Sequence, residues 1–122
     1  MISARSIPLF KQMLRSGGKV LVHEQEVQKG SDVRELNNLG LVKASRSVFP
    51  AIMLNLPIPL PAPLPDEVVN LLVDVYTSDT GVSIGDAKKR LSLSRIKELK
   101  DLGYVQLVTT NGALFLKAVE FK

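Results

Sequence analysis

A ten-residue segment occurs twice in this chain, and this repeat constrains the fold more than any other feature of the sequence. Residues 33–42 align without a gap to residues 96–105, with five identities and with Val/Ile and Arg/Lys exchanges among the other positions. Both copies contain Leu-x-x-Leu-Gly, which is typical of a helix that ends at a left-handed glycine. Because internal repetition indicates one structural unit used twice, the sequence predicts two small, similar modules.

The segments around the repeat also follow one order in both copies. That order is an amphipathic helix, a short strand, a second short helix (residues 24–29 in the first copy), the repeated helix and a two-stranded hairpin. Asp66 is predicted to cap the first helix of the second copy, and Ser31 in one copy and Ser92 or Ser94 in the other to cap the repeated helix. The hairpin strands are predicted at residues 41–44 and 51–56 in the first copy and at 105–108 and 113–118 in the second. The Asn111-Gly112 pair between the last two strands is a strong hairpin signal.

Proline occupies every second position from Pro57 to Pro65. Each ring fixes one φ angle and biases the preceding residue towards extended backbone, so this stretch is predicted to be a polyproline-type linker. At about 3.1 Å per residue it would span about 28 Å. The apolar Ile58, Leu60 and Leu64 suggest that it also lies against the modules. We therefore expect an α+β fold of two tandem modules, residues 1–56 and 66–122, joined by the linker 57–65.

Charge distinguishes the two halves. Residues 1–56 hold eight Lys or Arg against four Asp or Glu, whereas residues 66–122 hold eight of each. In the second half, however, six cations lie within residues 88–100. A basic cluster on one element indicates an anionic partner more specifically than a chain's total charge does.

The chain lacks the residues that metal binding, acid–base catalysis and phosphate-loop binding require. The chain has no Cys and a single histidine, His23. A metal site or an acid–base centre needs partners that His23 does not have at suitable spacing, and Gly17-Gly18 lacks the Lys-Ser/Thr of a phosphate-binding loop. We therefore expect a protein that is not an enzyme and that has no catalytic residues, no metal and no cofactor. With no long apolar segment, we expect no membrane association and a cytoplasmic protein.

Residues 91–105 resemble the turn, third helix and first wing strand of winged helix-turn-helix proteins. The resemblance extends over nearly all of residues 66–122 and, more loosely, over residues 6–56. It implies that the third helix of the second module enters the DNA major groove while the hairpin, or wing, touches phosphates or the minor groove. Ile96, Leu99 and Leu102 would then form the buried stripe of that helix.

The resemblance implies a set of contacts with double-stranded DNA in each module. In the second module the expected contacts are Lys88, Lys89, Arg90, Ser92, Ser94, Arg95, Lys97, Lys100, Thr110 and Asn111. In the first module they are Arg34, Asn37 and Arg46, although its third helix is polar rather than basic. That module is equally suited to binding a protein partner or a second copy of the chain.

Two functions follow as hypotheses. The first is sequence-specific binding of double-stranded DNA by a small regulator of transcription or replication, which would associate with the nucleoid. The alternative is a non-enzymatic scaffold, because tandem winged helices also resemble protein-binding subunits of chromosome-condensation and membrane-trafficking complexes. The exposed or buried state of the cations in residues 88–100 distinguishes the two, since a scaffold does not need them exposed on one face.

Overall fold

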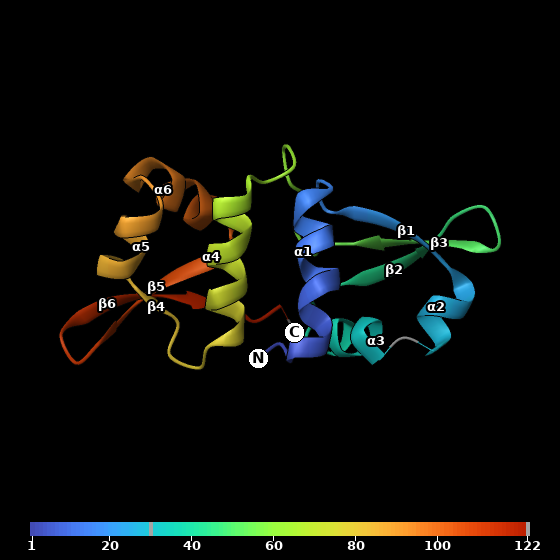
Figure 1. Ribbon diagram of the computed structural model, residues 1–122, viewed down its shortest axis with the longest axis horizontal. Helices are drawn as coiled ribbons and strands as arrows, with labels where there is room; N and C mark the ends of the chain where they lie inside the picture. The colour runs from blue at the N-terminus through green and yellow to red at the C-terminus, as the bar shows by residue number, and fades with distance from the viewer. Residues whose placement is uncertain (30, 122) are drawn as a thin grey trace. The chain divides into compact units, whose positions relative to one another are not determined.

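The chain folds into two compact units that each combine helices with a small sheet. The computed structural model describes residues 1–29 and 31–121. The N-terminal unit consists chiefly of Ile2–Leu64 and the C-terminal unit chiefly of Pro65–Val119. Each unit contains one three-stranded antiparallel sheet (Figure 1), so the predicted α+β class is confirmed.

The N-terminal unit has its last strand at the centre of its sheet, in the order β1-β3-β2. Val20 lies opposite Leu54 on the face that packs into the core, and both side chains are buried. Leu21 lies opposite Met53 on the outer face. The elements of this unit are a 3-10 turn at Ala4–Ser6, α1 (Ile7–Arg15), β1 (Lys19–His23), α2 (Glu24–Lys29), α3 (Ser31–Asn38), β2 (Lys43–Arg46) and β3 (Ala51–Asn55).

The proline-rich segment packs on the N-terminal unit. The Leu56 N–H donates to the Gly18 carbonyl at 2.9 Å, and the Leu64 N–H donates to the Leu14 carbonyl at 3.2 Å. Between these two bonds the backbone bends at residues 57–58 and again at residues 61–62. Residues 57–64 are therefore part of the N-terminal unit and do not run straight between the units.

Backbone hydrogen bonds terminate α3, and Phe121 packs over its C-terminal end. The Leu41 N–H donates to the Leu36 carbonyl at 2.9 Å, and Gly40 takes a φ of 76°, the left-handed ending that the sequence predicted. A Cβ on Gly40 would lie 3.0 Å from the backbone of Phe121. Glu120 and Phe121 thus belong to the N-terminal unit, although they follow the C-terminal unit in the chain.

Glu35 on α3 holds the start of the chain in place. Its Oε1 accepts hydrogen bonds from the Ser3 N–H at 2.9 Å and the Ser3 hydroxyl at 2.8 Å, and its Oε2 lies 3.6 Å from the Arg5 guanidinium. The nearby Ser6 hydroxyl, followed by the Ser3 N–H, contributes most to a pKa of about 2 for this carboxyl. The Ser6 hydroxyl itself falls short of full hydrogen-bond geometry, so Ser3 supplies the well-formed bonds.

We predict that Glu35→Gln removes part of the acid sensitivity of this protein. The folded-state pKa of Glu35 lies below its ordinary value of 4.5, so the unfolded chain binds the proton more tightly. The stabilisation by the carboxylate is therefore complete above pH 4.5 and lost as the pH falls towards 2. Melting temperatures of the two proteins, measured from acid to neutral pH, should converge at the acid end. Parallel profiles would show that Glu35 contributes nothing to the acid limb.

The C-terminal unit repeats the same order of elements and the same sheet topology. Its strands are ordered β4-β6-β5, again with the last strand at the centre. The Asn111-Gly112 turn joins β5 to β6 as predicted. The elements are α4 (Asp66–Thr77), β4 (Val82–Ser83), α5 (Ile84–Arg90), α6 (Leu93–Leu102), β5 (Val105–Thr110) and β6 (Ala113–Ala118).

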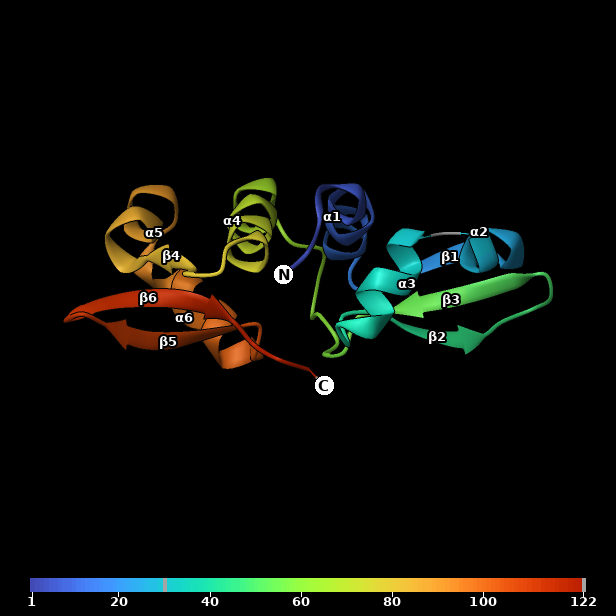
Figure 2. The ribbon, with the colours of Figure 1, turned by 90° about the horizontal axis from the view of Figure 1, so that it is seen from below.

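Tyr76 ties α4 to the start of the hairpin. Its hydroxyl donates to the Tyr104 carbonyl at 2.7 Å in a fully buried position. Burial raises the pKa of the Tyr76 phenol well above its ordinary value, so the hydroxyl stays a donor at physiological pH. Val69 and Leu72 lie on the same face of α4 and are buried as well. Figure 2 shows α4 and α5 on one side of the β5–β6 hairpin.

The structure corrects three of the local predictions. Asp66 is the first residue of α4; Pro65 occupies the N-cap, and no side chain caps the helix there. The first hairpin strand begins at Lys43 instead of residue 41, because Leu41 is used to close α3. The predicted cap Ser31 is already helical, and the position before it lies outside the described residues.

Gly81 provides a test of how β4 is held against β6. Gly81 has a φ of +79°, and a Cβ there would lie 2.1 Å from the Leu116 carbonyl oxygen. We expect Gly81→Ala to lower the free energy of unfolding by about 3 kcal/mol or more, since the clash adds to backbone strain. Urea unfolding followed by circular dichroism measures this.

Gly112→Ala is the matched control for Gly81→Ala. Gly112 has the same φ of +79°, but a Cβ there would meet nothing within 4 Å. It should cost only the left-handed strain of about 1–2 kcal/mol. Equal losses of stability for the two variants would mean that the close approach of Gly81 to β6 is not what restricts that position.

Candidate nucleic-acid interface

The C-terminal end of α5 carries three consecutive cations. Ser83 is the N-cap of this helix, and its Oγ accepts a hydrogen bond from the Asp86 N–H at 3.2 Å. Lys88, Lys89 and Arg90 occupy its last turn, and all three are exposed. Cations at this end of a helix interact favourably with the helix dipole. Local structure therefore favours this concentration of positive charge.

The turn between α5 and α6 is fixed by serine hydroxyls. The Ser92 Oγ accepts a hydrogen bond from the Arg95 N–H at 3.3 Å and shares a second bond with the Ser94 Oγ at 3.1 Å. This identifies Ser92, one of the two predicted caps, as the N-cap of α6. Both hydroxyls were expected to contact phosphate. In the folded chain Ser92 caps α6 and Ser94 bonds to it, and both side chains remain at the surface.

One face of α6 packs inward and the opposite face is open. Ile96 and Leu99 are buried, while Leu102 is half-buried. Leu93, which is 63% exposed, lies four residues before Lys97 and seven before Lys100. Since residues at these spacings share a face of a helix, the three side chains form one exposed stripe.

Two of the predicted cations are paired with carboxylates. The Arg90 guanidinium donates to Asp74 on α4, and Arg95 lies 3.7 Å from Glu98 on its own helix. Within residues 1–29 and 31–121, no ion pair is found for the four lysines of this region. We call these four exposed side chains the α5–α6 lysines: Lys88, Lys89, Lys97 and Lys100.

The β5–β6 hairpin forms a second predicted contact region. Thr110 ends β5, and Asn111 occupies the turn with a φ of 51°. Both are exposed. The hairpin tip points away from α6 in both ribbon views (Figures 1 and 2). The predicted residues of this unit therefore fall into two groups, one around α5 and α6 and one at the hairpin tip.

In the N-terminal unit the predicted residues are dispersed. Arg34 and Asn37 are on α3, and Arg46 ends β2; all are exposed. The Asn37 amide donates to the Val42 carbonyl at 3.1 Å. This bond stabilises the end of α3, so it competes with the base contact expected for Asn37. The structure brings no further predicted cation to this helix.

Sequence reasoning missed an apolar tip on the first hairpin. Val48 is 84% exposed and Phe49 is 80% exposed in the turn between β2 and β3. The turn is held by two backbone bonds, from the Ala51 N–H to the Val48 carbonyl and from the Glu24 N–H to the Pro50 carbonyl. The signal was present in the sequence, because two large apolar residues lie between the two predicted hairpin strands.

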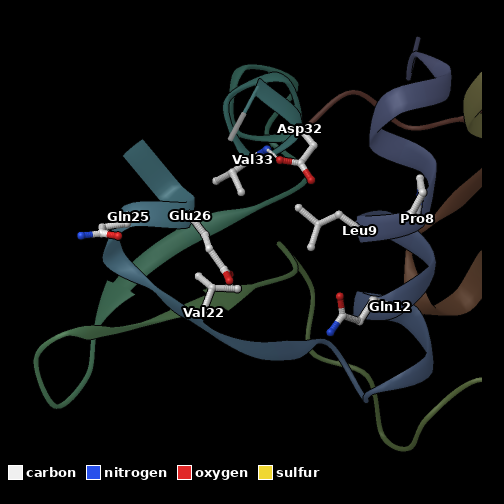
Figure 3. A pocket seen from close by; sticks show the side chains of 8 residues that line it. All are labelled: Pro8, Leu9, Gln12, Val22, Gln25, Glu26, Asp32 and Val33. Atoms are coloured by element: carbon white, nitrogen blue, oxygen red, sulfur yellow. Dashed lines mark hydrogen bonds between the residues drawn. The ribbon is translucent and has the colours of Figure 1, made fainter. Parts of the chain in front are cut away.

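A groove of about 590 Å³ lies between α1, α2 and α3 of the N-terminal unit. Leu9, Val22 and Val33 are among its lining residues, together with the carboxylates of Glu26 and Asp32. Figure 3 shows Leu9 and the Glu26 side chain directed into the groove, whereas the Gln25 amide points away from it. The groove was not anticipated, since its walls come from segments distant in the sequence.

Other kinds of site find no support in the described part of the chain. Among residues 1–29 and 31–121, no helix is long and apolar enough to cross a membrane. The same residues include no group of three or more His, Asp or Glu side chains placed to hold a metal ion. Comparisons with protein-family models, with curated proteins and with solved structures found no match for this chain.

The capping role of Ser92 can be tested directly. We expect Ser92→Ala to lower the free energy of unfolding by about 0.5–2 kcal/mol, the usual cost of losing an N-cap. Ser94→Ala is the matched control, because Ser94 lies inside α6 and does not accept the Arg95 N–H. Thermal unfolding by circular dichroism should rank Ser92→Ala as the less stable protein. The reverse order would place the cap at Ser94.

Proposed function

We propose that each unit is a winged-helix module and that the C-terminal unit binds double-stranded DNA. Support comes from the order of elements in both units, which is helix, strand, helix, helix and hairpin. In both, the strand before the second helix pairs with the last strand. This is the arrangement implied by the resemblance of residues 91–105 to the winged-helix family.

The observation that carries the proposal is the position of the α5–α6 lysines. They are exposed, with two on the last turn of α5 and two along α6, whose other face is buried. In our proposal the stripe of Leu93, Lys97 and Lys100 faces the major groove while Lys88 and Lys89 contact phosphates. Residues 86–101 hold six cations against three carboxylates, so the region attracts a polyanion.

The carboxylates restrict how DNA would be approached. Glu98 and Asp101 are exposed on α6 and repel phosphates. A carboxylate can accept a hydrogen bond from the cytosine amino group at a base edge. We therefore infer that Asp101, one helical turn after Lys97, points at a base edge, whereas Glu98 stays paired with Arg95. Such an arrangement suits a sequence-specific regulator of transcription or replication, acting at the nucleoid.

A protein-binding scaffold is the second candidate. The observation in its favour is the apolar surface of the C-terminal unit, where Leu93, Leu107 and Leu114 are exposed. Large apolar side chains left exposed are candidates for contact with another protein. The two candidates differ in what the α5–α6 lysines do, because only DNA binding requires them.

Salt-dependent binding to a labelled duplex tests the proposal. We expect anisotropy titrations to give a log–log slope of roughly −3 to −6 against salt concentration. Lys97→Gln combined with Lys100→Gln should weaken binding and reduce the size of the slope by about 2, because two fewer cations then displace counterions from the duplex. Changing all four α5–α6 lysines to Gln should abolish binding at moderate salt.

The matched control changes the same charge elsewhere. Lys19 and Lys43 are exposed on β1 and β2 of the N-terminal unit, and both lie opposite Asn55 in the sheet. Lys19→Gln with Lys43→Gln should leave the slope unchanged. If both pairs weaken binding equally, the attraction reflects net charge alone. If the unmodified protein does not bind at low salt, the scaffold becomes the better hypothesis.

A further inference from the structure

The N-terminal unit exposes an apolar tip that its own fold does not cover. We define the Phe49 tip as residues 46–50. Val48 and Phe49 have the largest exposed fractions among the described large apolar side chains, 84% and 80%. The tip is also anchored, since the Pro50 carbonyl accepts a hydrogen bond from the Glu24 N–H at 2.8 Å. Leaving an aromatic side chain in water on a fixed turn is unfavourable unless a partner covers it.

The same unit also contains a groove with apolar walls and a negative charge. Leu9, Val22 and Val33 line it with apolar surface, and Glu26 and Asp32 add two carboxylates (Figure 3). Its volume of about 590 Å³ is in the range of ligand-binding pockets, about 300–1,000 Å³, and is large enough for bulky side chains. Asp32 Oδ1 already accepts the Val33 N–H at 2.8 Å, so Glu26 is the more available anion.

The tip and the groove match in both polarity and charge. The tip offers apolar Val48 and Phe49 with the cation Arg46 three residues away, and the groove offers apolar walls with Glu26. We propose that the Phe49 tip of one copy of this chain inserts into the groove of a second copy. Phe49 packs on Leu9 and Arg46 pairs with Glu26.

The proposed contact is reciprocal. Both features adjoin α2, because Glu24 at its first residue bonds to the tip while Glu26, two residues later, lines the groove. Two copies facing each other across a twofold axis can therefore exchange tips, which gives a closed dimer with two equal contacts. A single chain does not satisfy the tip with its own groove, since Phe49 stays exposed. This dimer is independent of whether the chain binds DNA.

Sedimentation velocity over a range of protein concentrations tests the dimer. The unmodified chain should be dimeric at high concentration. Phe49→Asp should raise the dimer dissociation constant by roughly 30-fold or more, the effect of losing an aromatic anchor. Glu26→Lys should weaken the dimer from the groove side. Leu21→Asp is the control, because Leu21 is also exposed, at 57%, but lies on the outer face of β1.

Mixing the two weakened proteins separates this contact from other ways of associating. A Phe49→Asp chain keeps a complete groove and a Glu26→Lys chain keeps a complete tip, so the mixture should form a heterodimer with one intact contact. Arg46→Glu combined with Glu26→Lys in one chain should restore dimerisation through the reversed ion pair. Circular dichroism spectra matching the unmodified chain establish that each variant is folded.

Three results would overturn the proposal. The first is an unmodified chain that is monomeric at every concentration. The second is a dimer weakened equally by Leu21→Asp and Phe49→Asp, which would indicate general apolar association. The third is a mixture that stays monomeric, which would show that the tip of one chain does not enter the groove of another. If the unmodified chain is monomeric and Phe49→Asp instead reduces duplex binding, the tip is a DNA contact.

Discussion

The central position of the last strand holds each unit together. In the C-terminal unit β6 pairs with β5, its neighbour in sequence, and also with β4, which precedes two helices. Pairing across that separation brings the chain back on itself, so that α5 packs against β6 and α6 against β5. The close approach of Gly81 to Leu116 is part of this closure. The orientation of α6 therefore depends on a two-residue strand.

The same closure determines which charges reach the surface. With Ile96 and Leu99 turned inward, the 3.6-residue period of α6 leaves Lys97 and Lys100 on the outside. The arginines behave differently, because Arg90 and Arg95 are each held by a carboxylate. In the proposed DNA complex the lysines supply the attraction to phosphate, whereas the arginines first have to exchange a partner.

Local signals predicted much of this fold. The bounds of α2 and β6 and the Asn111-Gly112 turn agree with expectation, because periodicity, glycine and turn chemistry act over a few residues. Long-range contacts were not predictable in that way. The sequence pattern left Glu35 on an exposed helix face, but Ser3, far away in sequence, binds it. The exposed Phe49 was also missed, since burial depends on what the rest of the chain covers.

The path of the chain near Phe121 has a consequence for how the protein is made. The N-terminal unit includes Glu120 and Phe121, and Phe121 covers Gly40 at the end of α3. Its other residues leave the ribosome much earlier, while the C-terminal unit is still being synthesised. The N-terminal unit therefore lacks its contact with Phe121 until the C-terminal unit has been synthesised. The unit that starts first is completed last, after translation has passed the whole of its neighbour.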